Sequence, residues 1–206
     1  MTGGGVARGG EARGGEAGGA GRWPSLPPVI PVGTGTGPPT ATGTDGGWEL
    51  RLLTGEDPGE LDAVLATVPE ADRAATFHFF TVVPLPLDAF VTADPGRRTY
   101  GLFRGDEALA CTSVYAADPD ARTVMAGFTW IAPAWRGRGV NGAMKSALFS
   151  ALADAGVREV WFRADVENTA SCRALERCGA ERVRVDDSPR VYPDRVSRSV
   201  FYRRVL

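Results

Sequence analysis

A glycine-rich turn that leads into a long amphipathic helix constrains the fold of this chain more than any other segment. The turn is Arg136-Gly137-Arg138-Gly139, and apolar residues recur at helical spacing directly after it. These apolar residues are Val140, Met144, Ala147, Leu148, Ala151 and Leu152. A helix N-terminus offers free backbone N–H groups and the positive end of the dipole, and glycine lets a ligand approach the backbone. We therefore predict an anion-binding turn that suits a diphosphate.

Two well-known phosphate-binding loops can be compared with this turn. A Walker A loop needs Gly-Lys-Ser/Thr, and Lys145-Ser146 follows Gly142 two residues too late, which excludes it. The dinucleotide fingerprint G-x-G-x-x-G is matched by residues 137–142, and Asp165 stands near the place of the ribose-binding acid. Only 41 residues (206 − 165) follow that aspartate, too few for the further parallel strands of a dinucleotide fold. A Rossmann protein therefore remains the weaker alternative.

The segment before the turn predicts helices followed by an antiparallel meander. Residues 48–53 alternate like a strand, and Asp57-Pro58 has the chemistry of a helix start. Residues 70–92 are ambiguous: 77–80 could be helical, whereas Pro84 and Pro86 break any regular element. Strands are expected near 98–104, 107–116 and 122–132, with turns between them.

After the long helix, which Gly156 should end, the pattern predicts a strand, a helix and two strands. The strand spans 157–164, and Asn168 is a good N-cap for a helix that runs to Cys178-Gly179. The last strands are expected at 180–186 and 196–205, the latter at an edge where dimerisation would be possible. The whole order is that of one mixed sheet covered by helices.

Residues 1–47 differ in composition from the rest of the chain. They contain 16 of the 27 glycines and 6 of the 15 prolines, with almost no periodic apolar pattern. Such a stretch buries too little surface to offset its backbone entropy, so we expect a disordered tail over 1–47 and a folded domain over 48–206.

Charge and cysteine content limit the partners of the protein. A formal net charge of −2 gives no reason to expect nucleic acid or an anionic membrane. No segment approaches the roughly 18 apolar residues of a membrane span. Cys111, Cys172 and Cys178 have no metal-ligand spacing and leave an odd thiol if two pair, which indicates a reduced, cytoplasmic protein without a metal.

Two motifs in residues 128–180 carry a resemblance to a known family. The turn beginning at Arg136 is similar to the coenzyme loop Gln/Arg-x-x-Gly-x-Gly/Ala, with Asn141 at the last position. The stretch from Asn168 through Ser171 to Gly179 is similar to an Asn-x-x-Ser helix that ends in Lys/Arg-x-Gly. Both resemble motifs A and B of the GNAT family of N-acetyltransferases, in the branch of RimJ and RimL. The resemblance implies an α/β (mixed α+β) fold: a central mixed, mostly antiparallel sheet flanked by helices.

The same resemblance implies acetyl-CoA as co-substrate and a primary amine as acceptor. In the family the strands on either side of the long helix splay apart and hold pantetheine, so backbone groups of 128–131 should bind it, and amides of 138–143 should hold the pyrophosphate. The implied coenzyme-binding residues are Phe128, Thr129, Trp130, Ile131, Arg136, Gly137, Arg138, Gly139, Val140, Asn141, Gly142, Ala143, Asn168 and Ser171.

The resemblance leaves the proton carriers open. Many relatives place a tyrosine seven residues after the motif B asparagine, where this chain has Leu175, so Ser171 is the candidate acid. Candidate bases are Asp187 first, then Asp186, Glu167 and the lone His78. Cys172 and Cys178 have no histidine placed to activate them and are interpreted as helix packing.

The acceptor is the least constrained part of the prediction. It could be a protein N-terminus or a small-molecule amine, and the protein could be a monomer or a homodimer. Phe77, Phe79, Phe80 and Phe90 could line an acceptor pocket or belong to the core. A non-catalytic acyl-CoA-binding module of the same fold is the alternative, because the tyrosine is missing and the strand before the turn carries no Glu or His.

Overall fold

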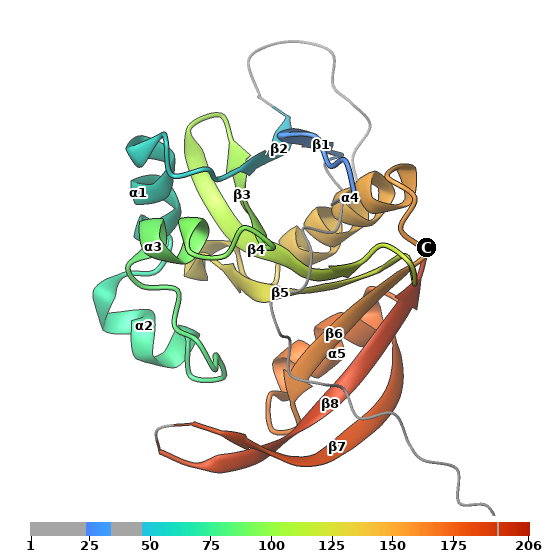
Figure 1. The fold of residues 1–206 in the computed structure, drawn as a ribbon. Helices are drawn as coiled ribbons and strands as arrows, with labels where there is room; N and C mark the ends of the chain where they lie inside the picture. Colours follow the sequence, from blue (N-terminus) through green and yellow to red (C-terminus); the bar gives the residue numbers. More distant parts are fainter. Residues whose placement is uncertain (1–23, 34–46, 193) are drawn as a thin grey trace, which may run out of the picture.

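The computed structural model describes residues 24–33, 47–192 and 194–206, and these ranges form one eight-stranded sheet (Figure 1). The order is β1-β2-β3-β4-β5-β6-β8-β7. All neighbouring strands are antiparallel except β5 and β6, which run parallel. The strands are β1 Val29–Val32, β2 Trp48–Leu52, β3 Arg98–Arg104, β4 Glu107–Asp118, β5 Thr123–Ile131, β6 Glu159–Asp165, β7 Glu181–Val191 and β8 Val196–Val205. The predicted mixed sheet is confirmed, and a parallel dinucleotide fold is excluded.

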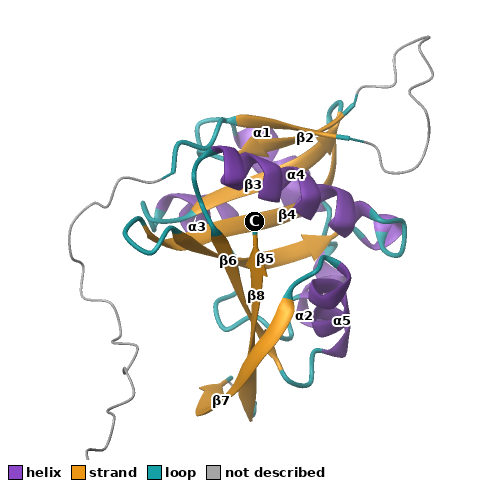
Figure 2. Ribbon diagram, turned by 90° about the vertical axis from the view of Figure 1, so that its right-hand side faces the viewer, coloured by secondary structure: helices purple, strands orange, loops and turns teal. Residues whose placement is uncertain are grey.

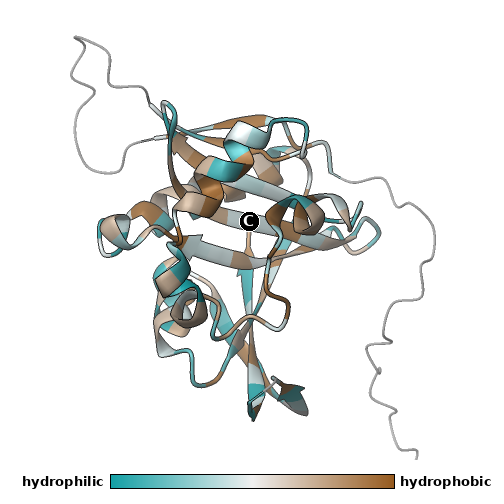
Figure 3. Cartoon of the chain, turned by 90° about the vertical axis from the view of Figure 1, so that its left-hand side faces the viewer, coloured by the Kyte–Doolittle hydropathy of each residue, from teal (hydrophilic) through white to brown (hydrophobic). Residues whose placement is uncertain are grey.

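Within the described ranges, five α-helices cover the two faces of this sheet. They are α1 Pro58–Ala66, α2 Glu70–Thr76, α3 Leu87–Thr92, α4 Val140–Asp154 and α5 Thr169–Arg177. Apolar residues of α4 and α5 pack into one core, whereas α1 and α3 pack into a second core on the opposite face (Figure 2). Figure 3 shows the molecule from the side of α1, coloured by hydropathy. No helix in the described ranges is long and apolar enough to cross a membrane.

Helix caps explain why the helices start where the sequence predicts. Asp57 accepts hydrogen bonds from the N–H groups of Gly59 and Glu60, 2.8 and 3.2 Å away. Asn168 caps α5 by accepting from the Ser171 N–H at 3.0 Å. Each cap satisfies amides that have no partner within the helix.

The segment 77–80 is not helical, contrary to one of the two predictions for it. Helix α2 ends at Thr76, and Phe77 turns into the second core, with its ring centroid 5.6 Å from that of Trp130. The burial of this phenylalanine is worth more than another helical turn at the surface. Phe80 contacts the same core beside Phe77.

The expected tail over residues 1–47 is wrong for residues 24–33, which belong to the folded domain. Val29–Val32 form β1 and pair with β2, and Leu26, Ile30 and Val32 are buried. These apolar residues pack on α4, so their contacts lie far along the chain and leave no periodic pattern within the glycine-rich stretch. Residues 1–23 and 34–46 lie outside the described part of the chain.

The last strand does not lie at an edge. Strand β8 pairs with β6 on one side and with β7 on the other, so β7 and β1 form the two ends of the sheet. The chain reaches the outer position first and then returns between β7 and β6. Dimerisation through an exposed β8 is therefore excluded.

We predict that Ile30→Ala lowers the free energy of unfolding by about 2–5 kcal/mol, because it deletes buried methyl groups. Ile30 is 4% exposed, whereas Val29 on the same strand is 46% exposed. Val29→Ala is therefore the matched control and should change stability by less than about 0.5 kcal/mol. Equal, small effects of both variants in denaturant titrations would show that β1 does not pack on the domain in solution.

Candidate active site

A cleft opens where β5 and β6 separate. The two strands pair only from Thr123 to Met125 and from Glu159 to Trp161. Beyond these residues, the edge of β5 that faces β6 has no strand partner, so its N–H and C=O groups are available to a ligand. The cleft has a volume of about 660 Å³, and its walls come from β4, β5, β6, β7, α4, α5 and the segment after α2.

A β-bulge lies in the open part of β5. Ser113 of β4 pairs with Gly127, but Cys111 pairs with Trp130, so β5 has one extra residue between them. Phe128 has a positive φ of 48° at this point. Residues 127–131 all line the cleft, and the bulge changes the direction of their backbone groups. The sequence singled out 128–131 as residues that bind the coenzyme, and the structure places them in the cleft, but the bulge was not predicted.

The predicted anion-binding turn stands at one end of the cleft. Gly137 and Gly139 have φ values of 75° and 79°, and a Cβ at either would meet nothing within 4 Å. Glycine is therefore required for the backbone conformation and not for space. No side chain caps α4, and its first internal hydrogen bond runs from the Ala143 N–H to the Gly139 carbonyl at 3.1 Å. The preceding amides of the first turn remain available to a ligand.

The two arginines of the turn have different positions. Arg136 lines the cleft, and its guanidinium donates to the Ile131 carbonyl and to Thr76 Oγ1, each at 3.1 Å. It thereby joins the turn to β5 and α2. Arg138 is exposed and lies over the Trp135 ring at 5.6 Å, outside the cleft lining.

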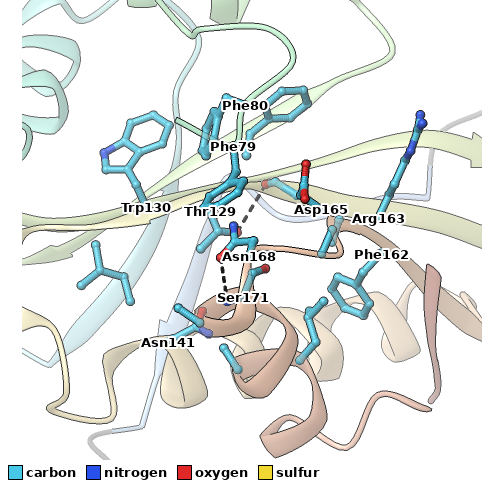
Figure 4. Close-up of a pocket in the computed structure, with 18 of the residues that line it drawn as sticks. Phe79, Phe80, Thr129, Trp130, Asn141, Phe162, Arg163, Asp165, Asn168 and Ser171 are labelled. Carbon is cyan, nitrogen blue, oxygen red and sulfur yellow. Dashed lines mark hydrogen bonds between the residues drawn. The ribbon is translucent and has the colours of Figure 1, made fainter. Parts of the chain in front are cut away.

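The predicted residues at the starts of α4 and α5 lie in the cleft (Figure 4). Asn141, Asn168 and Ser171 all line it. Asn141 Oδ1 is buried without a hydrogen-bond partner among the described residues, which fits a ligand that donates an N–H there. The Ser171 hydroxyl makes no hydrogen bond within the described chain. Leu175, at the position where many relatives have tyrosine, also lines the cleft.

A buried lysine lies below the bulge. Lys145, the only lysine of the chain, is 3% exposed, and its Nζ donates to Thr112 Oγ1 at 2.9 Å and Thr129 Oγ1 at 3.1 Å. No carboxylate among the described residues forms an ion pair with it. Burial lowers the pKa of Lys145 to about 8. An amine that is partly neutral near physiological pH therefore lines the cleft.

One carboxylate lines the cleft, and its oxygens are already hydrogen-bonded. Asp165 is 1% exposed; its Oδ1 accepts from Ser197 Oγ and the Glu167 N–H, each at 2.8 Å, and its Oδ2 accepts from the Tyr192 hydroxyl at 2.7 Å. Burial acts to raise the pKa of Asp165, but these hydrogen bonds outweigh it and hold the pKa below its usual value. Asp165 is therefore a poor proton acceptor, and it fixes the hairpin β7–β8 to the end of β6.

None of the predicted bases whose side chains are described lines the cleft. Glu167 and His78 are exposed outside it, and Asp186 on β7 is also outside the lining. Asp187 lies on β7, but its side chain is outside the described part of the structure. No group of three or more potential metal ligands occurs among the described residues.

The aromatic candidates divide between cleft and core. Phe79 and Phe80 line the cleft across from Asn168 and Ser171 (Figure 4), whereas Phe77 and Phe90 are buried in the second core. Cys172 and Cys178 are free thiols that pack against the first core, in line with their interpretation as helix packing.

Sequence reasoning missed Tyr115, Lys145, Arg163 and Arg190, all of which line the cleft. Tyr115 lies on β4 so close to Gly127 that a Cβ there would be 3.0 Å from its hydroxyl, which explains the glycine. Burial raises the pKa of Tyr115. Only Lys145, as the single lysine on the apolar side of a predicted helix, gave a signal in the sequence. The others reach the cleft through long-range strand pairing.

Comparison with known proteins agrees with this geometry. A family model described as an acetyltransferase (GNAT) domain matches residues 50–181. No curated protein matches the sequence.

Three solved structures illustrate the similarity of fold. An acetyl transferase of Salmonella typhimurium that modifies the N-terminal serine of the ribosomal protein L7/L12 is 18% identical, with a TM-score of 0.70, over 86% of this chain and 99% of that one. RimL in complex with coenzyme A is 18% identical, with a TM-score of 0.65, over 86% and 98%. A GCN5-related N-acetyltransferase of Brucella melitensis is 16% identical, with a TM-score of 0.67, over 85% and 82%.

We predict that Lys145 titrates with a midpoint near pH 8 in the folded protein, compared with the ordinary 10.5 in the unfolded chain. Because it is the only lysine, lysine-selective isotope labelling gives one NMR signal whose pH dependence reports this pKa directly. A midpoint near 10.5 would show that Nζ is hydrated and not buried.

The free energy of unfolding should depend on pH because of the lowered pKa of Lys145. Between the two pKa values the unfolded chain binds more protons, so this lysine adds stability as pH rises. The unfolding free energy of the wild type minus that of Lys145→Met should increase by about 3 kcal/mol between about pH 7 and about pH 11.

Proposed function

Because this chain belongs to the GNAT family of acetyltransferases, we propose that it transfers an acetyl group from acetyl-CoA to a primary amine within a ternary complex. The proposal depends on one observation: two backbone segments without hydrogen-bond partners meet at one cleft. One is the open edge of β5, and the other is the uncapped first turn of α4. Neither needs a particular side chain, which fits a coenzyme that is held mainly by its amides and phosphates.

The chain supplies partners for both parts of coenzyme A. The open backbone of residues 128–131 pairs with the amides of pantetheine, as one strand would pair with another. The amides of Val140, Asn141 and Gly142 bind the pyrophosphate, where the helix dipole favours negative charge. The unpartnered Asn141 Oδ1 accepts a hydrogen bond from the pantetheine side. Of the two arginines, Arg136 supports the turn and Arg138 adds charge at its outer side.

In the reaction the lone pair of the acceptor nitrogen attacks the thioester carbonyl. The N–C bond forms, the C–S bond breaks, and one proton leaves the nitrogen while the coenzyme departs as a thiolate or thiol. A thiol has a reference pKa of about 8.5, so its departure needs little acid assistance. Orientation by the cleft and stabilisation of the oxyanion by free β5 amides supply most of the rate enhancement.

Ser171 is our candidate for the group that donates a proton to the departing sulfur. Its side chain lines the cleft, and its hydroxyl has no hydrogen bond to any other described residue. We keep Asp187 on β7 as a candidate base. Asp165, at the end of β6, takes no part in proton transfer, because its oxygens already accept hydrogen bonds from Tyr192 and Ser197.

The acceptor is an amine of a protein N-terminus or of a small molecule. The free thiols fit a cytoplasmic location, and we place the enzyme there as a monomer or homodimer.

Thiol release from acetyl-CoA, followed with a thiol reagent against a panel of amines and N-terminal peptides, tests the function. Turnover with at least one acceptor is expected. Coenzyme binding without turnover across a broad panel would favour the alternative, a non-catalytic acyl-CoA-binding module.

We predict that Gly139→Trp weakens coenzyme A binding at least about tenfold, or 1.4 kcal/mol, because the side chain fills the anion site and strains a left-handed residue. Gly105→Trp is the matched control, since Gly105 also has a positive φ of 59° and open space but lies in the turn between β3 and β4. Calorimetry should find wild-type affinity for the control. Unchanged affinity in Gly139→Trp would show that the diphosphate lies elsewhere.

We predict that Ser171→Ala lowers kcat about a hundredfold, as expected for loss of a general acid. Ser150→Ala is the control, because Ser150 lies on the exposed side of α4 and donates to the Ser146 carbonyl. If both variants turn over at the wild-type rate, Ser171 has no role in proton transfer.

A further inference from the structure

The part of the cleft beyond the coenzyme strands contains an excess of positive charge. We call it the acceptor end and define it by Phe79, Tyr115, Arg163 and Arg190. Charged residues of the whole lining are Arg136, Lys145, Arg163, Asp165 and Arg190. The only acid among them, Asp165, already accepts three hydrogen bonds from groups of the protein. The acceptor end therefore has no carboxylate that could pair with a cationic substrate.

Arg190 is the least satisfied of these cations. It comes from β7, and its Nη2 donates to the Phe79 carbonyl at 3.3 Å. Its Nε and Nη1 are buried and have no hydrogen-bond partner among the described residues, and no described carboxylate lies within ion-pair distance. Buried donors without acceptors are costly, most of all on a charged group, and such groups usually meet a ligand, an ion or water.

A second guanidinium faces the same space. Arg163 projects from β6 on the same side as Asp165 and away from Phe162 (Figure 4). Its Nε donates to Ser199 Oγ at 2.7 Å, and it has no described acidic partner. Burial lowers the pKa of Arg190, and the nearby positive charge of Arg163 adds to that effect, whereas Tyr192 and the carboxylate of Asp165 act in the opposite direction. Two positive charges face one negative charge here, and the oxygens of that carboxylate are already hydrogen-bonded to the protein, so this end of the cleft complements an anion.

Contacts that do not involve Nε and Nη1 of Arg190 hold the acceptor end in place. The Tyr192 hydroxyl bonds to Asp165, and Arg195 donates to the His78 carbonyl at 3.0 Å, so the hairpin β7–β8 and the segment after α2 are joined. Arg195 itself pairs with Asp194. The anchoring of the hairpin thus uses Tyr192 and Arg195, and the unpaired N–H groups of Arg190 are not needed for it.

We infer that the acceptor amine carries an oxyanion, a carboxylate or phosphate group, close to the reacting nitrogen, and that Arg190 and Arg163 bind this group. This inference rests on the proposed acetyl transfer. Arg190 and Arg163 act as specificity-determining residues, because guanidinium N–H groups match the geometry of carboxylate and phosphate oxygens.

The same charges explain how the amine loses its proton without a dedicated base in the described lining. Nearby cations favour the neutral form of an ammonium group and so lower its pKa. The anionic group of the substrate offsets their repulsion during binding. Polyamines and other acceptors with several positive charges are excluded by the same field.

Matched acceptor pairs test this inference with the full-length wild-type enzyme at saturating acetyl-CoA. One pair is a free amino acid and its amide, and the other is a peptide with glutamate or glutamine at its second position. These two arms separate a small-molecule acceptor from a peptide N-terminus that carries the same chemistry. In at least one arm the anionic member should have a kcat/KM about tenfold higher or more. Equal or better turnover of the neutral members would overturn the inference while leaving acetyl transfer intact.

Arg190→Gln identifies the residue responsible. The ratio of kcat/KM for the anionic acceptor to that for the neutral acceptor should fall about tenfold, mainly because the KM of the anionic acceptor rises. Arg182→Gln, at an exposed arginine on the same strand outside the cleft, should behave as the wild type. An equal loss with both acceptors would show a structural role for Arg190 and would contradict the inference. Absence of turnover with every amine would refute the proposed function together with it.

Discussion

The cleft depends on one interruption of the sheet: β5 and β6 pair over three residues and then separate. Each strand is held on its other side, β5 by β4 and β6 by β8, so the gap persists without loss of the sheet. The bulge at Phe128 and the long helix α4 lie directly at this separation. Backbone groups that cannot pair with a strand must bind solvent or a ligand. The interruption therefore creates the recognition surface, and the side chains around it adjust its chemistry.

The side chains of the cleft form an unusually basic lining for a protein with a net charge of −2. Lys145 is buried beneath β5, and two arginines face the acceptor end. Asp165 serves as a structural anchor that joins β6 to the hairpin β7–β8. Such a lining favours negatively charged ligands at both ends: phosphates at the turn, and an oxyanion near Arg190. It also favours neutral amines over ammonium ions, which assists acyl transfer.

Local signals in the sequence predicted the elements around the glycine turn. The helix from Val140, the cap at Asn168 and the three-strand meander depend on short-range periodicity and capping, and all are confirmed. Strand β1 was missed because its burial depends on packing against α4, more than a hundred residues away. The internal position of β8 and the convergence of Tyr115, Arg163 and Arg190 likewise depend on strand order, which no local pattern specifies. The glycine turn and its helix could therefore be predicted, whereas the convergence of side chains at the acceptor end could not.

Hydrogen–deuterium exchange with and without coenzyme A tests whether the open edge of β5 and the first turn of α4 hold the coenzyme. The amides of 127–131 that point away from β4, and the amides of 137–142 before the first internal hydrogen bond of α4, have no strand or helix partner and should exchange quickly in the free protein. Coenzyme A should slow exchange in both segments together, with little change in the hairpin β7–β8. If coenzyme A binds but protects neither segment, the cleft between β5 and β6 is not its site.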